Sequence, residues 1–159
     1  MRLYIKQHVW SFRDKFYIKD EFGNDIYFVE GELFSFGHKL HIYNNQSQEV
    51  VYIKQKPWSF LPKYEVYMNN VMVAHIVKDF TFFEHKYVIE GTNLVIEGDF
   101  FAHDYRILDG NYVVAYINKA WFTWGDSYEI NVADPVNALL TIACVLTIDC
   151  SMASNNNGG

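Results

Sequence analysis

Residues that build disulfide scaffolds and disordered chains are scarce in this sequence. Only two of its 159 residues are cysteines and only three are prolines. Two cysteines are too few for the disulfide framework of a small secreted domain, and so little proline is unusual in a disordered chain. Residues 1–8 also lack the apolar stretch of a secretory signal peptide. We therefore expect a folded, cytoplasmic protein in which Cys144 and Cys150 are buried thiols.

Positive charge is also in short supply. Thirteen lysines and arginines stand against nineteen aspartates and glutamates, which gives a net charge of -6. An acidic chain is repelled at long range by nucleic acids and by anionic bilayers. The sequence therefore predicts no nucleic-acid partner, and any anion site must be a local cluster of cations.

Motifs for metal or cofactor binding are absent too. His38 and His41 are the only close pair among six histidines. Two side chains three residues apart on one strand point to opposite faces, so this pair is a poor start for a metal site. We expect neither a metal nor a cofactor.

No catalytic motif is recognisable either. The candidate nucleophiles lack the sequence context of a nucleophile elbow, and the candidate carboxylates have no spacing that would bring two of them together. These candidates are Ser11, Ser59, Cys144, Asp99, Asp104 and Asp126. The sequence therefore predicts no catalytic residues.

Aromatic residues and alternating apolar residues are abundant. Aromatic residues make up 18% of the chain and hydrophobic residues 50%, enough for strands and a large core. Alternation of apolar and polar residues predicts four strands at the start of the chain, separated by turn residues at 21–24 and 35–37. These strands are expected at residues 3–7, 15–20, 25–30 and 39–43.

The chain also repeats itself. Residues 4–16 align without gaps on residues 52–64, with eight of thirteen positions identical, and residues 64–89 align on residues 105–130. Self-similarity at such a spacing indicates one structural unit that occurs several times. We expect three units of four strands each. Their bounds are about 1–45, 50–91 and 92–132.

One long apolar run lies near the end of the sequence, from Pro135 to about residue 152. As a helix it would rise about 28 Å, close to the thickness of a bilayer core. Polar residues such as Asp149 interrupt it and no lysine or arginine flanks it, so we expect a helix in the protein core and not a transmembrane span. Asp134 is a suitable cap before Pro135. Residues 153–159 are expected to form a flexible tail.

Twelve strands and one apolar helix limit the fold to two alternatives. Twelve strands are too many for a flat open sheet, and a closed antiparallel barrel removes the exposed edges. A β-trefoil also has three repeats of four strands, but its strands fill its core, whereas a wider barrel needs the helix. We therefore expect one mainly β domain over residues 1–152, a closed barrel of about 12 strands around a central C-terminal helix. A β-trefoil with a C-terminal helix is the alternative.

Four features of the sequence resemble the LURP-one-related family. They are the opening Tyr4-Ile-Lys-Gln7, the Val-Ala-x-Ile pattern at 73–76 and 114–117, the pair Asp134-Pro135, and the apolar helix as the last element. The resemblance places the chain with the Tubby C-terminal and phospholipid scramblase domains, and it implies a twelve-stranded barrel threaded by its C-terminal helix. Tubby domains bind phosphoinositide head groups through lysines and arginines on the barrel wall, and scramblase-like members act at membranes. This chain departs from the Tubby pattern in being acidic and short, and many small members of the family have no assigned activity.

A repeated block of cations and aromatic residues is the best candidate for a binding site. Cations beside aromatic rings can hold a phosphate group and rest on a membrane surface. The alternative is structural, because repeated lysines and aromatic residues also serve as edge charges and core anchors of each unit. The cations are Lys6, Arg13, Lys15, Lys54, Lys56 and Lys63, and the neighbouring rings are Trp10, Phe12, Trp58 and Phe60.

These observations favour a non-enzymatic, cytoplasmic scaffold or binding domain. Its expected partner is a phosphoinositide or another anionic lipid, which would make the protein peripheral to a membrane, or else a protein. The alternative is a small enzyme with its site at the barrel rim, because a helix that fills the barrel leaves only the rim for a substrate.

Overall fold

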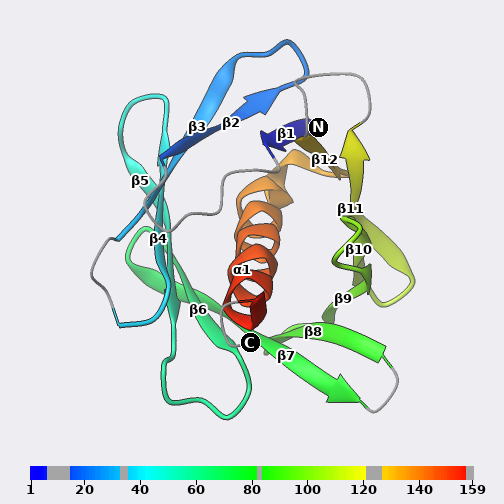
Figure 1. Cartoon of the computed structure of the whole chain (residues 1–159). Coiled ribbons are helices and arrows are strands. Elements are labelled where there is room, and N and C mark those ends of the chain that lie inside the picture. The colour runs from blue at the N-terminus through cyan, green and yellow to red at the C-terminus, as the bar shows by residue number, and fades with distance from the viewer. Residues whose placement is uncertain (7–14, 33–35, 82–83, 121–126, 157–159) are drawn as a thin grey trace.

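Twelve strands and one long helix make up the described part of the chain (Figure 1). The computed structural model describes residues 1–6, 15–32, 36–81, 84–120 and 127–156. The strands are β1 (Arg2–Lys6), β2 (Phe16–Asp20), β3 (Asp25–Gly31), β4 (Lys39–Asn44), β5 (Glu49–Gln55), β6 (Lys63–Met68), β7 (Val71–Thr81), β8 (Glu84–Glu90), β9 (Leu94–Asp99), β10 (Asp104–Asp109), β11 (Tyr112–Ala120) and β12 (Ser127–Val132). A short 3₁₀ turn, η1 (Pro135–Asn137), leads into the helix α1 (Ala138–Asn156).

The strands form a closed antiparallel barrel around the helix (Figure 1). Each strand pairs with the next one in the chain, and β1 pairs with β12, where Leu3 lies opposite Ile130. The prediction of a closed barrel is therefore confirmed. The alternative of a β-trefoil is wrong, because all twelve strands belong to one barrel and the helix occupies its lumen. The four strands predicted for the first unit match β1–β4 to within one residue at each end.

Bulges recur where paired strands bend around the helix. The register shifts once in each of the pairs β2–β3, β4–β5, β6–β7 and β10–β11. The extra residue of each bulge is Ile26, Val50, Val73 or Val114. Bulges increase the local twist and bend of a strand, so they help a sheet of this width to close.

The two ends of the barrel carry different connections. The end where α1 starts is named the base, and its turns lie at residues 21–24, 45–48, 69–70, 91–93 and 110–111. The end where α1 finishes is named the mouth, and its described connections lie at residues 36–38, 56–62 and 100–103. At the base, Asn69 and Asn70 have φ angles of 49° and 62°. Positive φ at both positions is what a two-residue hairpin turn requires, and asparagine tolerates it well.

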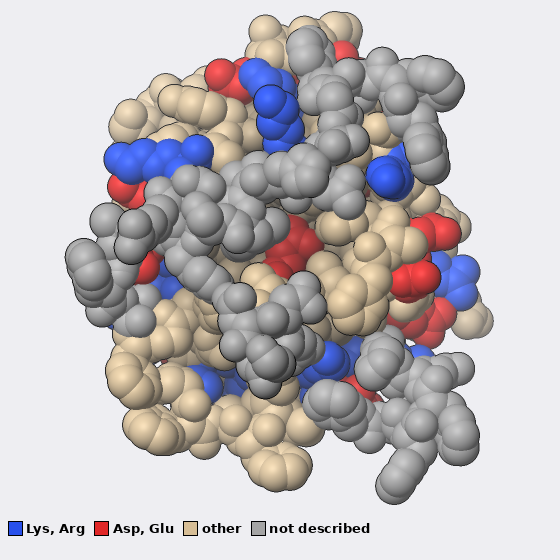
Figure 2. Space-filling model, viewed as in Figure 1, with Lys and Arg blue, Asp and Glu red and all other residues tan. Residues whose placement is uncertain are grey.

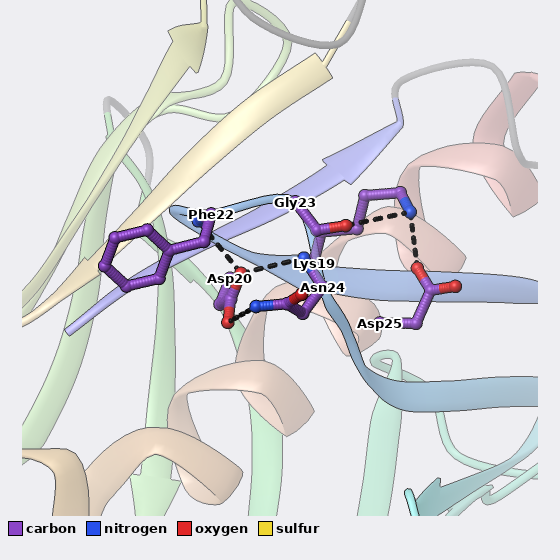
Figure 3. A network of polar contacts seen from close by, with 6 residues as sticks. All are labelled: Lys19, Asp20, Phe22, Gly23, Asn24 and Asp25. Atoms are coloured by element: carbon purple, nitrogen blue, oxygen red, sulfur yellow. Dashed lines mark hydrogen bonds and ion pairs between the residues drawn. The ribbon is translucent and has the colours of Figure 1, made fainter.

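Side-chain hydrogen bonds fix the base turn between β2 and β3 (Figure 3). The Asp20 carboxylate accepts hydrogen bonds of 2.9 Å from the backbone N–H groups of Phe22 and Asn24 and from the side-chain amide of Asn24. All three bonds favour the ionised carboxylate. The Asn24 side chain and the backbone N–H groups therefore lower the pKa of Asp20.

The helix begins as the sequence predicts and continues further than expected. The Asp134 carboxylate accepts a hydrogen bond of 3.1 Å from the Val136 N–H, and Pro135 follows the cap directly. The predicted end at residue 152 is wrong, because α1 runs four residues further, to Asn156. Residues 153–156 are therefore helical, and residues 157–159 lie outside the described part of the chain.

The barrel core is built from the inner faces of the strands and all sides of the helix. Ile142, Val145, Leu146 and Ile148 of α1 are fully buried. Burial of each such side chain contributes about 1.5 to 3 kcal/mol. Cys144 and Cys150 are also buried and free, as predicted. The helix is thus surrounded by strands on every side.

Length and composition alone would allow this helix to cross a membrane. Residues Pro135–Ser154 have a mean hydropathy of 1.8. The core helix of a folded domain meets the same criterion, and 67% of the apolar window is buried inside the barrel. The structure places the segment in the barrel lumen.

Leu146→Asp should abolish cooperative unfolding, because it places an unpaired charge in the lumen at a cost of more than about 4 kcal/mol. Urea unfolding followed by circular dichroism measures this. Val136→Asp is the control, since Val136 is 80% exposed at the start of the helix. A sharp transition of normal midpoint in Leu146→Asp would contradict the role of the helix as the core.

Candidate functional site

The predicted cation block lies near the mouth, and several of its lysines are already paired. The Nζ atom of Lys15 lies 2.9 Å from Glu30, that of Lys56 lies 3.1 Å from Glu65, and that of Lys63 lies 2.8 Å from Glu90. Lys6 and Lys54 are exposed at the ends of β1 and β5 that face the mouth. Arg13, Trp10 and Phe12 lie outside the described residues. The described members of the block therefore form a rim in which three of five lysines are paired with carboxylates.

Exposed aromatic side chains gather at the same end of the barrel. Trp58 is 86% exposed and Phe60 fully exposed, although both belong to the repeated block. Phe36 stacks on Trp58 with ring centroids 5.6 Å apart. Phe101, on the β9–β10 connection, is 68% exposed as well. The structural alternative, in which the aromatic residues of the block anchor the core, is thus wrong for Trp58 and Phe60.

Sequence analysis missed Phe36 and Phe101. Each lies in a connection from an odd-numbered to an even-numbered strand, as Trp58 and Phe60 do. In an antiparallel barrel of consecutive strands all such connections reach the same end. The strand count could therefore have assigned them to one surface.

Charge is distributed unequally between the two ends. Acidic residues dominate at the base: Asp20, Glu21, Asp25, Glu49, Asp109 and Asp134. Lysines border the mouth together with acidic residues: the lysines are Lys6, Lys15, Lys39, Lys54, Lys56 and Lys63, and the acidic residues include Glu30, Glu32, Asp99 and Asp104. Figure 2 shows blue side chains around this face, with red carboxylates between several of them. The base is thus predominantly acidic, whereas the mouth carries lysines and carboxylates side by side.

A second group of polar side chains lies inside the barrel near the mouth. Asp149 of α1 is 3% exposed, and its Oδ2 accepts a hydrogen bond from the Tyr128 hydroxyl. The Nε2 atom of His103 lies 3.4 Å from Oδ1 of Asp149, and the His103 ring stacks on Tyr128. His103 has a φ of 50°, which few non-glycine residues adopt. The β9–β10 connection is thereby attached to the last turns of the helix.

The buried Asp149 side chain affects the pKa values of the groups around it. Burial, and then the charge of Asp149, raise the pKa of Tyr128 and of Tyr105 well above the usual range. Burial and the same charge raise the pKa of the Cys150 thiol. These groups stay protonated at neutral pH, so Tyr128 is a hydrogen-bond donor to Asp149 and Cys150 is not a nucleophile.

Chemistry at this cluster would need access for a substrate. Three clefts are lined by described residues, and neither Asp149 nor His103 lines any of these three. Sequence analysis noted Asp149 only as an interruption of the apolar run. Its partner His103 lies 46 residues away in the chain, so no local pattern could have paired them.

The two histidines that are close in the sequence, His38 and His41, lie in different environments. His38 and His41 diverge as predicted: His38 Nε2 lies 2.6 Å from Ser154 Oγ on α1, and His41 lies on the outside between Glu32 and Glu49. Among the described residues no group of three or more histidine, cysteine or acidic side chains could hold a metal ion.

Two of the candidate carboxylates belong to residues at paired positions of neighbouring strands. Asp99 and Asp104 lie opposite each other where β9 pairs with β10. The Asp99 carboxylate accepts a hydrogen bond of 3.0 Å from the Ala102 N–H, which stabilises the turn. Both residues line an outer cleft with Lys86, Glu97 and Arg106. Asp126 lies outside the described residues, as does Ser11.

Comparison with known proteins identifies the family. A family model described as LURP-one-related matches residues 1–149. The chain belongs to the LURP-one-related family. A relative in this family, the uncharacterized protein YxjI of Bacillus subtilis (strain 168), is 34% identical over 149 residues, which cover 94% of this chain and 92% of that protein. A protein from Arabidopsis thaliana with a known X-ray structure is 11% identical, with a TM-score of 0.59 over 89% of this chain and 88% of the plant chain. That similarity extends to the fold alone.

Tyr128→Phe should destabilise this LURP-one-related domain by about 1 to 3 kcal/mol, because it leaves an oxygen of the buried Asp149 side chain without its hydrogen-bond donor. Tyr105→Phe is the matched control, since the Tyr105 hydroxyl is buried without a hydrogen-bond partner among the described residues, and its loss should be neutral or stabilising. Urea midpoints compare the two variants. Equal losses in both would show that the Tyr128–Asp149 bond has no special role.

Burial of His38 should make the stability of the folded protein depend on pH. Burial lowers the pKa of His38 to about 4, from 6.5 in an unfolded chain. The unfolded state thus binds a proton more readily between these values, so the free energy of unfolding should fall as pH drops from about 6.5 to 4, by up to about 3 kcal/mol. Urea unfolding at a series of pH values measures the fall, and His38→Gln should reduce it.

His41→Gln is the control for that experiment. Burial alone would lower the pKa of His41, but the Glu32 and Glu49 carboxylates outweigh it and raise the pKa. A raised pKa stabilises the folded state at low pH and loses this effect as pH rises. Removal of His41 should therefore leave the fall above about pH 5 at least as large as in the native protein. An unchanged fall in His38→Gln would refute the assignment to His38.

Proposed function

We propose that this protein is a non-enzymatic binding domain that docks with its mouth on an anionic membrane surface. The observation that carries the proposal is the set of exposed aromatic side chains at the mouth, Phe36, Trp58, Phe60 and Phe101. Large exposed apolar groups that cluster at one end of a protein mark an interaction surface. Tryptophan and phenylalanine are also suited to the boundary between lipid head groups and acyl chains.

The lysines around the mouth supply the electrostatic part of the attraction. A lysine close to an anionic bilayer contributes about 1 kcal/mol. Exposed ion pairs such as Lys15–Glu30 contribute only about 0 to 1 kcal/mol, so a lipid phosphate can compete with the carboxylate. Phosphoinositides and other anionic lipids of a cytoplasmic leaflet fit this chemistry.

The acidic residues of the base do not oppose this orientation. Electrostatic interactions are screened over about 8 Å at physiological ionic strength. The 19 residues of α1 span about 28 Å between base and mouth. A bilayer at the mouth is therefore several screening lengths away from the base, and the net negative charge of the whole chain is a poor guide to how the mouth behaves.

One observation favours the second candidate, a small enzyme with a site at the rim. His103 and Asp149 form a buried pair near the mouth, and such pairs serve as general acid and base in many enzymes. The pair also has a structural role, because Asp149 accepts a hydrogen bond from Tyr128 and His103 stacks on the Tyr128 ring. We therefore prefer binding as the function.

Sedimentation with liposomes tests the membrane proposal. The protein should sediment with phosphatidylcholine vesicles that contain a phosphoinositide, and much less with phosphatidylcholine alone. The double variant Trp58→Ala, Phe60→Ala should bind at least about tenfold more weakly. Burial of each aromatic side chain in the bilayer should contribute more than about 1.5 kcal/mol to the free energy of binding. Higher salt should also weaken binding.

Phe22→Ala is the matched control for the double variant. Phe22 is 79% exposed but lies at the base, so its loss should leave vesicle binding unchanged. Equal, negligible sedimentation of the native protein with both kinds of vesicle would overturn the membrane proposal and leave the mouth as a surface for a protein partner.

A further inference from the structure

The helix does not fill the barrel evenly. It lies closest to β5 and β12. On another side, at the base, a cleft of about 280 Å³ lies between the first turns of α1 and the strands β8 to β11. This cleft is at the opposite end of the barrel from the aromatic mouth, so an occupant here is independent of the membrane proposal.

The cleft has an apolar floor and a polar rim. Ile89, Ile107 and Cys144 are buried in its floor, and Val114 and Leu140 form its walls. At the rim lie Thr92, Asn93, Asp109 and Asn137. A concave apolar site with a few polar groups at one side is the usual form of a small-molecule site.

Two residues of the cleft distinguish the third repeat from the second. Asp109 takes the place that the half-buried Met68 has in the second repeat, 41 residues earlier, although the first repeat has an acid there as well, Asp20. Val114 and Val73 are both the extra residues of bulges, but Val114 is 6% exposed toward the helix whereas Val73 is 44% exposed. The second repeat thus forms without an acid or an inward bulge at these two places.

The size and the chemistry of the lining define the occupant. An apolar cavity of about 150 Å³ is large enough for benzene. The cleft of 280 Å³ has room for a short chain together with a polar head. The carboxylate of Asp109 accepts hydrogen bonds and carries negative charge, so a head that donates hydrogen bonds suits the rim and a carboxylate head does not.

We propose that this cleft binds a small amphiphile, with an apolar body of about six carbons and a hydrogen-bond-donating head such as an amine or an alcohol. The body lies against Ile89, Ile107 and Val114. The head lies at the rim beside Asp109. Amines are preferred to alcohols because they also carry the opposite charge.

Titration of isotope-labelled protein with three probes tests this site by nuclear magnetic resonance. Hexylamine and 1-hexanol should cause saturable shifts of the amide signals of 92–94, 109 and 137–141. Hexanoate, which has the same chain and a repelled head, should bind more weakly than either. Shifts that do not saturate, shifts spread over the whole barrel, or equal binding of hexanoate would overturn the proposal.

Asp109→Asn distinguishes the contribution of the ligand's head from that of its apolar body. Asp109 is exposed, so the variant should fold normally, and it should weaken hexylamine binding by about three- to fivefold while hexanol affinity stays within about twofold. Glu21→Gln makes the same change of charge at another base turn and should alter neither affinity. Equal effects of the two variants on hexylamine would show that Asp109 makes no contact with the head.

Val114→Phe fills the cleft and should abolish the saturable shifts with all probes. Val73→Phe is its control at the equivalent bulge of the second repeat and should leave binding unchanged. If Val114→Phe does not fold, Asp109→Asn still decides the proposal. Undiminished hexanol binding to a folded Val114→Phe protein would overturn it.

Discussion

The packing of one apolar helix inside the barrel is the constraint on which the other features depend. Twelve strands enclose a lumen too wide for their own side chains to fill. Helix α1 fills the lumen with side chains such as Ile142, Leu146 and Ile148, which are fully buried. Side chains of the inner wall, such as Ile18 and Ile76, are fully buried around the helix. Because strands and helix bury their surfaces in each other, neither can form a stable core alone.

The same helix makes the two ends of the barrel chemically unlike. At the base the chain turns sharply through Asp134 and Pro135, and the helix leaves a cleft beside β8 to β11. At the mouth the last turns carry Asp149 and Ser154, which contact His103, Tyr128 and His38. A binding site inside the barrel therefore has to lie at one end or the other, because the lumen between them is packed.

Much of the fold could be predicted from the sequence because it depends on local rules. Alternation of polar and apolar residues located β1 to β4, and the repeat extended the same pattern to the other two units. Asn69 and Asn70 form a two-residue loop between two strands, a position that favours positive φ, and asparagine tolerates it. The helix was identified because it is apolar on all sides, which only a surrounded helix can be.

Contacts between residues far apart in the chain could not be predicted from the sequence. The pairing of Lys63 with Glu90 depends on the stagger of strands in the closed barrel, and that of His103 with Asp149 depends on how far the helix advances through it. No spacing rule predicts such contacts, since they are set by the barrel geometry as a whole.

The order of the elements along the chain affects how the protein is made. Strand β1 is completed at Lys6, but its partner β12 ends at Val132 and the helix that supports both ends at Asn156. At a synthesis rate of about 5 to 20 residues per second, the intervening 150 residues take about 8 to 30 seconds. Through that interval β1 is an open edge beside an empty lumen. The barrel can therefore close only after residue 156 has been synthesised, and until then the growing polypeptide must remain soluble without its core.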